Sequence, residues 1–374
     1  MAREDLMDRA CELAERGRYT AAPNPLVGAV VAREGETVGE GWHERTGSNH
    51  AEINALRNAG EDSENATMHV TLEPCNHHGR TPPCTTAIIQ AGISKVVIGH
   101  LDPDPRMRGR SVRILRGAGI EVEVLDDPRL ERQNEQFFGA MRNGRPFVHL
   151  KLAATLDGRI AAANGDSKWV TGEAARRRAH ELRAEAGAVL VGAGTVRADD
   201  PTLTVRGLSD EPPRIFRVVL DPNLTMTANE GLAQTARETP VLVFAKRNHD
   251  SARAQALEES GVEIVPSETS EEYLDLHFVL EELRRRGVRG LLVEGGGDTA
   301  GRFLEQGLVD KATLFYAPKV MGSEGVPMIG KLRLSRMADA LKFSVSEVRQ
   351  LEDDVAMTLY PREIIEEDRV HRAG

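Results

Sequence analysis

The feature of this sequence that most restricts its fold is an alternation of helical segments with short β-branched runs, which occurs twice. In the first half, helices are expected at residues 4–16, near residue 50, and at 85–92 and 108–119, with strands at 26–33, 67–74, 95–103 and 120–125. This alternation is typical of an α/β sandwich with mostly parallel pairing. Residues 39–47 read as a turn, and residues 126–146 as a mixed polar stretch without a clear period.

The alternation restarts after that stretch and continues almost to the end of the chain. At 374 residues, the chain also exceeds the size at which a single hydrophobic core usually stops growing. We therefore expect a first domain over residues 1–145, a second over 146–362, and a flexible tail over 363–374. In the second domain, strands are expected within 147–161, 188–195, 213–222, 240–246, 261–266, 290–297 and 311–322, and helices at 171–186, 276–287 and 299–308.

Composition limits the partners of the chain. A formal charge of −10 and only 4% aromatic residues argue against a nucleic-acid surface. The first residues read as an amphipathic helix, and no apolar run reaches eighteen residues, so neither export nor a membrane span is predicted. Three cysteines suit a reducing compartment, and we expect a cytoplasmic protein. The oligomeric state stays open, with a homo-oligomer among the options.

Two of the cysteines form a candidate metal site with a histidine. Catalytic zinc takes three protein ligands and leaves one position to water, and His50, Cys75 and Cys84 supply that number and type. Zinc would lower the pKa of its water to about 7. Glu52, two residues beyond the histidine, would then carry a proton from this water to a leaving amine, as in zinc deaminases.

One alternative is a structural zinc site with four protein ligands, in which His77 or His78 supplies the fourth. The eight residues between Cys75 and Cys84 also depart from the two-residue gap of most zinc deaminases. The sequence alone leaves both site types open.

Longer motifs favour the catalytic site. The runs "NPLVGAVV", "GEGWH", "HAE" and "EPCNHHGRTPPC" together resemble the bifunctional deaminase–reductase of riboflavin biosynthesis. The resemblance implies a cytidine-deaminase-like α/β/α domain with zinc on His50, Cys75 and Cys84 and the proton shuttle at Glu52. It further implies that Asn24, His43 and His77 line the pyrimidine pocket, although His43 also fits a surface turn.

Two residues depart from the pattern of that family. Asp104 stands where an asparagine is usual, and Ser111 stands where a second glycine is usual. Both lie outside the expected metal ligands, so the departures concern only the rim of the pocket.

In the second half, two glycine clusters follow strands, in "VGAGTVRADDP" and "VEGGGDTAG". Backbone amides at a helix start can bind a phosphate or pyrophosphate, although tight turns alone also explain such glycines. Neither cluster has the spacing of a dinucleotide-binding Rossmann fingerprint.

The second half also resembles the reductase part of the same family, whose fold is similar to dihydrofolate reductase. The shared runs include "LKLAATLDGRIA", "SKWVTG", "VGAGTVRADDPTLTVR" and "VEGGGDTAGRFLEQGLVD". The resemblance implies NADPH as cofactor. It implies dinucleotide contacts from Ala153, Trp169, Thr195, Asp199, Gly296, Gly297, Asp298 and Thr299, and substrate contacts from Ser167, Arg183, Leu203, Arg206 and Glu294.

The reduction needs a hydride and a proton source. Lys151 could donate the proton or polarise the substrate, with Asp199 as an orienting group; a solvent-facing lysine is the simpler alternative. Trp169 could likewise be ordinary core packing.

We therefore predict a bifunctional enzyme of riboflavin biosynthesis. Its first domain would remove the C2 amine of 2,5-diamino-6-ribosylamino-4(3H)-pyrimidinone 5′-phosphate, and its second would reduce the ribosyl group to ribityl with NADPH. Two other functions remain to be distinguished: a nucleoside or RNA-editing deaminase with an unrelated C-terminal module, and a zinc-stabilised binding protein without turnover.

Overall fold

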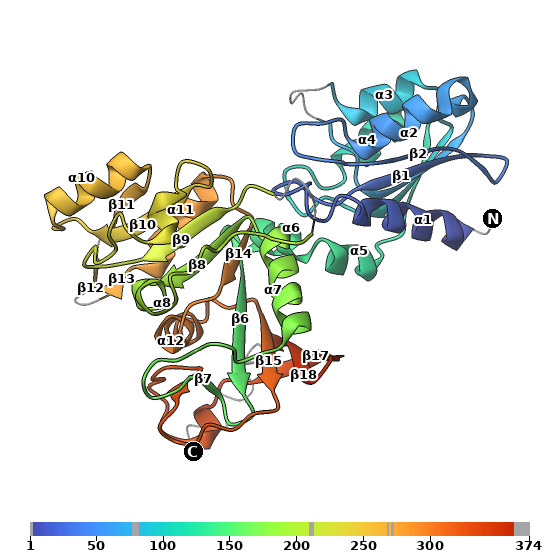
Figure 1. Cartoon of the computed structure of the whole chain (residues 1–374). Helices are drawn as coiled ribbons and strands as arrows, with labels where there is room; N and C mark the ends of the chain where they lie inside the picture. Colours follow the sequence, from blue (N-terminus) through green and yellow to red (C-terminus); the bar gives the residue numbers. More distant parts are fainter. Residues whose placement is uncertain (1–2, 77–81, 209–212, 268, 271–272, 363–374) are drawn as a thin grey trace, which may run out of the picture. The chain divides into compact units, whose positions relative to one another are not determined.

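The computed structural model describes residues 3–76, 82–208, 213–267, 269–270 and 273–362 (Figure 1). The chain divides into two compact units, Met1–Arg145 and Pro146–Gly374. In the parts that the structure describes, no helix is long and apolar enough to cross a membrane.

The N-terminal unit is built on a five-stranded sheet with the order β2-β1-β3-β4-β5. β1 pairs antiparallel with β2 and β3, whereas β3, β4 and β5 pair in parallel. The strands are β1 (Gly28–Arg33), β2 (Glu36–Trp42), β3 (Thr67–Leu72), β4 (Lys95–His100) and β5 (Glu121–Val124). The helices are α1 (Arg3–Glu15), α2 (Ala51–Ala59), the 3-10 turn η1 (Gly60–Ser63), α3 (Cys84–Gln90), α4 (Arg110–Gly117), α5 (Pro128–Gln133) and α6 (Glu135–Asn143).

Alternating strand residues give this sheet two apolar faces. Val30 and Val97 pack with α1 residues such as Leu13 in one buried cluster. Ala29, Val31, Met68 and Ile98 point the other way and pack with residues of α2, α3 and α4, including Ala55, Ile88 and Leu115. Because side chains of a strand alternate between faces, one sheet supports both helix layers. The unit is therefore an α/β/α sandwich.

Three local expectations for this unit were wrong. Residues 39–42, expected to begin a turn, belong to strand β2, and the polar stretch 126–146 contains α5 and α6. The pairing is mixed, because β1 is antiparallel to both of its neighbours. The glycines of β2 obscured its strand pattern, although these glycines have a packing role described below.

The C-terminal unit has a nine-stranded sheet with the order β11-β10-β9-β8-β14-β6-β15-β18-β17. Its strands and short β-bridges are β6 (Phe147–Thr155), β7 (Arg159–Ala161), β8 (Ala188–Gly192), β9 (Phe216–Leu220), β10 (Val241–Lys246), β11 (Glu263–Ser267), β12 (Thr269–Ser270), β13 (Tyr273–Leu274), β14 (Gly290–Val293), β15 (Lys311–Ala317), β16 (Val326–Pro327), β17 (Phe343–Leu351) and β18 (Asp354–Pro361). Its helices are α7 (Glu173–Glu185), α8 (Ala193–Asp199), α9 (Gly231–Gln234), α10 (Ser251–Ser260), α11 (Leu276–Arg285), α12 (Gly297–Glu305) and the 3-10 turn η2 (Met337–Asp339).

The neighbouring strands from β11 to β15 all pair in parallel, as expected for this half. β8 and β14 are buried along almost their whole length, which is typical of parallel strands covered on both faces. One face packs against α11 and α12 through Leu280, Leu283 and Phe303.

Several elements of this unit were not anticipated from the sequence. They are helices α8, α9 and α10 and the antiparallel hairpin β17–β18, which completes one edge of the sheet. The expected tail, residues 363–374, lies outside the described residues.

Candidate active sites

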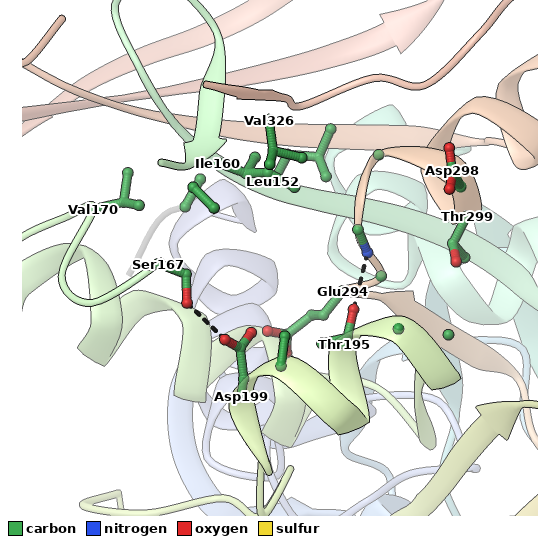
Figure 2. Close-up of a pocket in the computed structure, with 18 of the residues that line it drawn as sticks. Leu152, Ile160, Ser167, Val170, Thr195, Asp199, Glu294, Asp298, Thr299 and Val326 are labelled. Atoms are coloured by element: carbon green, nitrogen blue, oxygen red, sulfur yellow. Dashed lines mark hydrogen bonds between the residues drawn. The ribbon is translucent and has the colours of Figure 1, made fainter. Parts of the chain in front are cut away.

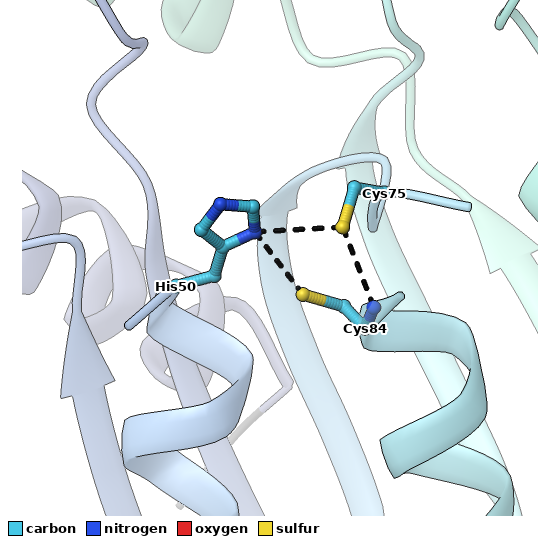
Figure 3. A group of neighbouring side chains, drawn as sticks. All are labelled: His50, Cys75 and Cys84. Atoms are coloured by element: carbon cyan, nitrogen blue, oxygen red, sulfur yellow. Dashed lines mark hydrogen bonds between the residues drawn. The ribbon is translucent and has the colours of Figure 1, made fainter. Parts of the chain in front are cut away.

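His50, Cys75 and Cys84 converge at one point in the N-terminal unit (Figure 3). His50 Nδ1 lies 3.2 Å from Cys84 Sγ and 3.5 Å from Cys75 Sγ, and the three ligand atoms lie within 4.8 Å of one another. One imidazole and two sulfurs at these separations fit a tetrahedral zinc ion. Within the described residues this group has three members, and His77, the suggested fourth ligand or pocket residue, lies outside them.

Each ligand comes from the end of an element. His50 is the N-cap of α2, Cys84 opens α3, and Cys75 lies in the loop after β3. α2 lies against β2 because Gly39 and Gly41 have no side chains: a Cβ on Gly41 would come within 2.4 Å of the Ala51 carbonyl oxygen. These glycines therefore set the position of His50 and of the residues that follow it.

The surroundings favour a thiolate at this point. The pKa of Cys75 is lowered to about 4, because the Cys84 thiol donates a hydrogen bond to it and His50 and the Cys84 amide stabilise its charge. The Cys84 amide nitrogen lies 3.3 Å from Cys75 Sγ. The same shared hydrogen bond, together with burial, raises the pKa of Cys84. A metal cation would replace this shared proton and stabilise both thiolates.

Glu52 lies in the first turn of α2 and is 3% exposed. Burial raises the pKa of its carboxyl, and the neighbouring Cys75 raises it further. A carboxyl with a raised pKa can both accept and return a proton near neutral pH, as a general acid/base must.

Asn24 and His43 are adjacent to this group. Asn24 Nδ2 lies 3.0 Å from His43 Nε2, and His43 Nδ1 lies 3.1 Å from the Asn49 carbonyl oxygen. The carbonyl can only accept, so Nδ1 donates and Nε2 accepts from Asn24. The His43 ring is 3% exposed and its centroid is 5.6 Å from that of His50, so the surface-turn alternative for His43 is wrong. Contact of either residue with a pyrimidine stays a prediction.

The second site is a cavity of about 560 Å³ in the C-terminal unit (Figure 2). It opens near the carboxyl ends of β8 and β14, where ligands of parallel sheets usually bind. It is lined by all eight residues expected to contact the dinucleotide and by three further predicted residues: Ala153, Trp169, Thr195, Asp199, Gly296, Gly297, Asp298 and Thr299, with Lys151, Ser167 and Glu294.

Three charged side chains meet in the wall of this cavity. Arg183 holds the Glu294 carboxylate by two hydrogen bonds, Nε–Oε1 at 2.5 Å and Nη2–Oε2 at 2.9 Å. Lys151 Nζ lies 3.5 Å from Glu294 Oε2, and its side chain is only 17% exposed. The solvent-facing alternative for Lys151 is therefore wrong.

Polar contacts fix the cavity walls. Ser167 Oγ donates to Asp199 Oδ1 at 2.6 Å, and the Gly296 amide donates to Thr195 Oγ1 at 3.2 Å; Figure 2 shows both bonds. A Cβ on Gly297, at the start of α12, would come within 2.5 Å of the Pro327 carbonyl oxygen. This glycine is therefore required by close packing.

Trp169 is 66% exposed and lines the cavity, so the core-packing alternative for it is wrong. The Arg176 guanidinium carbon lies 4.5 Å from the Trp169 ring centroid, and Arg176 Nη1 donates to the Thr171 carbonyl. Sequence reasoning missed Arg176, because one arginine in the run "RRR" of a predicted helix carries no distinguishing signal. It also missed apolar lining residues such as Ile160 and Val326.

Three predicted substrate residues are not among those that line the cavity. Arg183 reaches its wall through Glu294 and also donates to the Thr204 carbonyl. Arg206 is exposed. The Leu203 side chain is 2% exposed with a backbone φ of +51°, so any ligand contact at Leu203 would use its backbone. Their roles stay predictions.

Comparison with known proteins follows the same division of the chain. Residues 1–100 match the family described as the cytidine and deoxycytidylate deaminase zinc-binding region, and residues 146–357 match the RibD C-terminal domain. The riboflavin biosynthesis protein RibD of Aquifex aeolicus is 42% identical, with 95% of this chain and 97% of that protein covered. The chain belongs to the RibD family.

Other RibD proteins agree. The Escherichia coli protein is 40% identical, with 96% of this chain and 99% of that protein covered. The structure of Acinetobacter baumannii RibD is similar, with a TM-score of 0.88 and 37% identity over 96% of this chain and 99% of that one. A Thermotoga maritima structure named as a diaminohydroxyphosphoribosylaminopyrimidine deaminase/5-amino-6-(5-phosphoribosylamino)uracil reductase has a TM-score of 0.85 and 37% identity, with 96% and 98% covered.

Membership of the RibD family makes the chain a bifunctional deaminase and reductase of riboflavin biosynthesis. The predicted fold class, a cytidine-deaminase-like domain followed by a reductase domain, is confirmed, as is the predicted enzyme class. The matched regions support zinc in the deaminase and a nicotinamide cofactor in the reductase. Neither the RNA-editing nor the non-catalytic alternative fits a chain of this family.

Proposed function

We propose that the N-terminal unit removes the C2 amine of 2,5-diamino-6-ribosylamino-4(3H)-pyrimidinone 5′-phosphate with zinc, and that the C-terminal unit then reduces the ribosyl group to ribityl with NADPH. The observation that carries this proposal is the convergence of His50, Cys75 and Cys84 beside the buried carboxyl of Glu52. The names of the relatives and the composition of the second cavity support the assignment of substrate and order.

In the deaminase unit, His50 Nδ1 and the two cysteine sulfurs would hold the zinc ion. Zinc, when bound, supplies a Lewis acid that makes water nucleophilic at neutral pH. Glu52 accepts a proton from the attacking water and passes it to the amine nitrogen as its bond to C2 breaks, which releases ammonia. Asn24 and His43 orient the flat ring of the pyrimidine from the side of His50.

In the reductase unit, the start of α12 and the residues Thr195 and Asp199 would hold the dinucleotide. The first amides of a helix have no partner within it, so Gly297 and its neighbours suit a phosphate oxygen. NADPH, when bound, supplies the hydride. Lys151 Nζ donates a proton to the substrate carbonyl or imine that is reduced, and Glu294 holds Lys151 in position. Arg183 and Arg206 bind the phosphate of the substrate.

We propose a cytoplasmic location, because zinc binding requires reduced thiols at Cys75 and Cys84. The predicted partner is the small-molecule substrate. No nucleic-acid partner is predicted, and a homo-oligomer is one option for the assembly.

A reciprocal pair of substitutions tests the proposal in the full-length protein. Glu52→Gln removes the proton carrier, so the rate of ammonia release should fall about 10²- to 10⁴-fold while NADPH oxidation with the deaminated substrate is retained. Lys151→Met should slow NADPH oxidation with the deaminated substrate while the rate of ammonia release is retained. Ammonia release and NADPH absorbance are followed separately for each variant.

Near wild-type deamination by Glu52→Gln would refute the proposed deaminase mechanism, and near wild-type reduction by Lys151→Met would refute the role of that lysine. Loss of both activities in either variant would indicate a general loss of structure, which circular dichroism detects. NADH used as efficiently as NADPH would contradict the cofactor assignment.

A further inference from the structure

The loop that carries Cys75 is tied to the start of α4 by one buried carboxylate. Glu73 is 6% exposed and accepts hydrogen bonds from three backbone amides: Gly109 at 2.8 Å and Asp102 at 3.2 Å on Oε2, and Ser111 at 2.9 Å on Oε1. A carboxylate at a helix N-terminus is stabilised by the free amides and the dipole of that helix. Glu73 therefore holds the residues before Cys75 against α4.

Ser111 makes a second contact with the loop that carries Cys75. It is fully buried, and its hydroxyl donates to the Pro74 carbonyl oxygen at 2.6 Å. The Ser111 hydroxyl oxygen in turn accepts a hydrogen bond from Asn76 Nδ2 at 3.0 Å. Pro74 and Asn76 are the two neighbours of Cys75 in the chain, so a single hydroxyl holds the metal ligand from both sides.

Among the described residues, the Asn76 side chain hydrogen-bonds to Ser111 alone. Its Oδ1 is buried and has no hydrogen-bond partner among the described residues. The orientation of the amide thus depends on the bond to Ser111, whose hydroxyl hydrogen is already used by Pro74. Alanine at position 111 would leave both the Pro74 carbonyl and the Asn76 amide without their buried partner, and each loss lowers the stability of the fold.

We propose that Ser111 is a positioning residue for the metal centre, which fixes Cys75 Sγ by bridging the residues on either side of it. The inference rests on the zinc site of the proposed function and adds a residue to it. Residues that hold metal ligands in place commonly affect metal affinity about 10- to 100-fold. Because Ser111 acts through the backbone and the Cys84 amide also contacts Cys75 Sγ, we expect the low end of that range.

The experiment compares full-length, zinc-loaded wild type with Ser111→Ala, Asn76→Ala and the double variant. Zinc release to an excess of a chromophoric chelator is timed, and thermal unfolding is recorded with and without zinc. Ser111→Ala should release zinc about tenfold faster. The gain in unfolding temperature that zinc gives should be smaller in Ser111→Ala than in wild type, beyond any loss of stability that the zinc-free variant already shows. The double variant should match Ser111→Ala, since Asn76 acts through the same hydroxyl.

Ser63→Ala is the matched control. Ser63 is a buried serine of the same unit whose hydroxyl donates to the Gly60 carbonyl at 2.8 Å, beyond the far end of α2 from His50. Its zinc release should equal that of wild type. The proposal is overturned if Ser111→Ala releases zinc within about twofold of wild type. It is also overturned if Ser111→Ala destabilises the zinc-free and zinc-loaded proteins equally, or if the effects of the two single variants simply add. A wild type that binds no zinc would overturn the proposed metal site itself.

Discussion

Glu294 is the residue whose ionisation is most strongly set by its neighbours in the reductase cavity. Burial alone would raise its pKa, but the charges of Arg183 and Lys151 and their hydrogen bonds lower the pKa to about 2, from an ordinary 4.5. A carboxyl with a depressed pKa stabilises the folded state above its unfolded pKa, and this contribution is lost as pH falls toward the folded value. The contribution of Glu294 is therefore complete above about pH 4.5 and disappears toward pH 2.

Glu294→Gln should destabilise the C-terminal unit by about 3–5 kcal/mol at neutral pH, because it leaves buried Arg183 and Lys151 without a counter-charge. The difference from wild type should shrink between pH 4.5 and 2, where wild-type Glu294 takes up its proton. Urea unfolding across this pH range measures both effects. A difference in stability that does not change with pH would contradict the conclusion that Glu294 is ionised in the folded protein.

Glu281→Gln provides the comparison. The pKa of Glu281 is also lowered to about 2, first by a hydrogen bond from Arg284 and then by Arg285, but this carboxylate lies at the surface of α11. Solvent screens such pairs, so this substitution should change stability little.

At the level of single residues, sequence predicts a ligand well where the chemistry restricts the residue type. His50, Cys75 and Cys84 could be selected because few side chains bind zinc, and the structure brings them together. The stack of Arg176 on Trp169 could not be found in this way. Many residues can pack over an indole, so neither type nor spacing identifies the partner.

At the level of elements, α12 shows how closely the reductase cavity is packed. Gly297 and Gly301 lie one turn apart in this helix, and both face residues that precede η2. A Cβ on Gly297 would come within 2.5 Å of the Pro327 carbonyl oxygen, whereas one on Gly301 would meet Gly330 at an ordinary 3.5 Å. Only the first position requires glycine on steric grounds.

Gly297→Ala should therefore lower the free energy of unfolding by about 1–3 kcal/mol through overpacking. It should also weaken cofactor binding, because β16 must move away from α12. Gly301→Ala is the control in the same helix. It should stay within about 1 kcal/mol of wild type, since alanine favours the helix. Chemical unfolding and the KM for NADPH measure the two effects. Equal stability and equal KM in the two variants would contradict the prediction that the close contact at Gly297 excludes a larger side chain.

The elements that sequence predicted correctly were those with a clear apolar period, such as β4 and β14 and helices α11 and α12. β2 was missed because Gly39 and Gly41 read as turn residues, although they allow α2 to approach the sheet. β17 was missed because it is an edge strand with an almost wholly exposed pattern. Packing between elements decided these cases, and a local pattern does not contain that information.

At the level of the whole molecule, each unit has its own core and its own site. Metal binding to a folded unit adds to the stability of that unit alone when the ligands all belong to it. His50, Cys75 and Cys84 all lie in the N-terminal unit.

Removal of zinc by a chelator should therefore lower the unfolding temperature of the N-terminal unit and abolish ammonia release. The unfolding temperature of the C-terminal unit and the rate of NADPH oxidation with the deaminated substrate should stay unchanged. Differential scanning calorimetry and the two activity assays measure this, and added zinc should reverse it. A parallel shift of both transitions would show that the units unfold together.

The exposed indole at the reductase cavity has a practical consequence. The chain contains two tryptophans, Trp42 in the N-terminal unit and Trp169 in the C-terminal one. Trp42 is partly buried beneath the Arg16 guanidinium, whereas Trp169 meets solvent at the cavity wall. Replacing Trp42 by phenylalanine leaves Trp169 as the single tryptophan, so its emission, excited apart from the tyrosines, can follow occupancy of the reductase cavity without any attached dye.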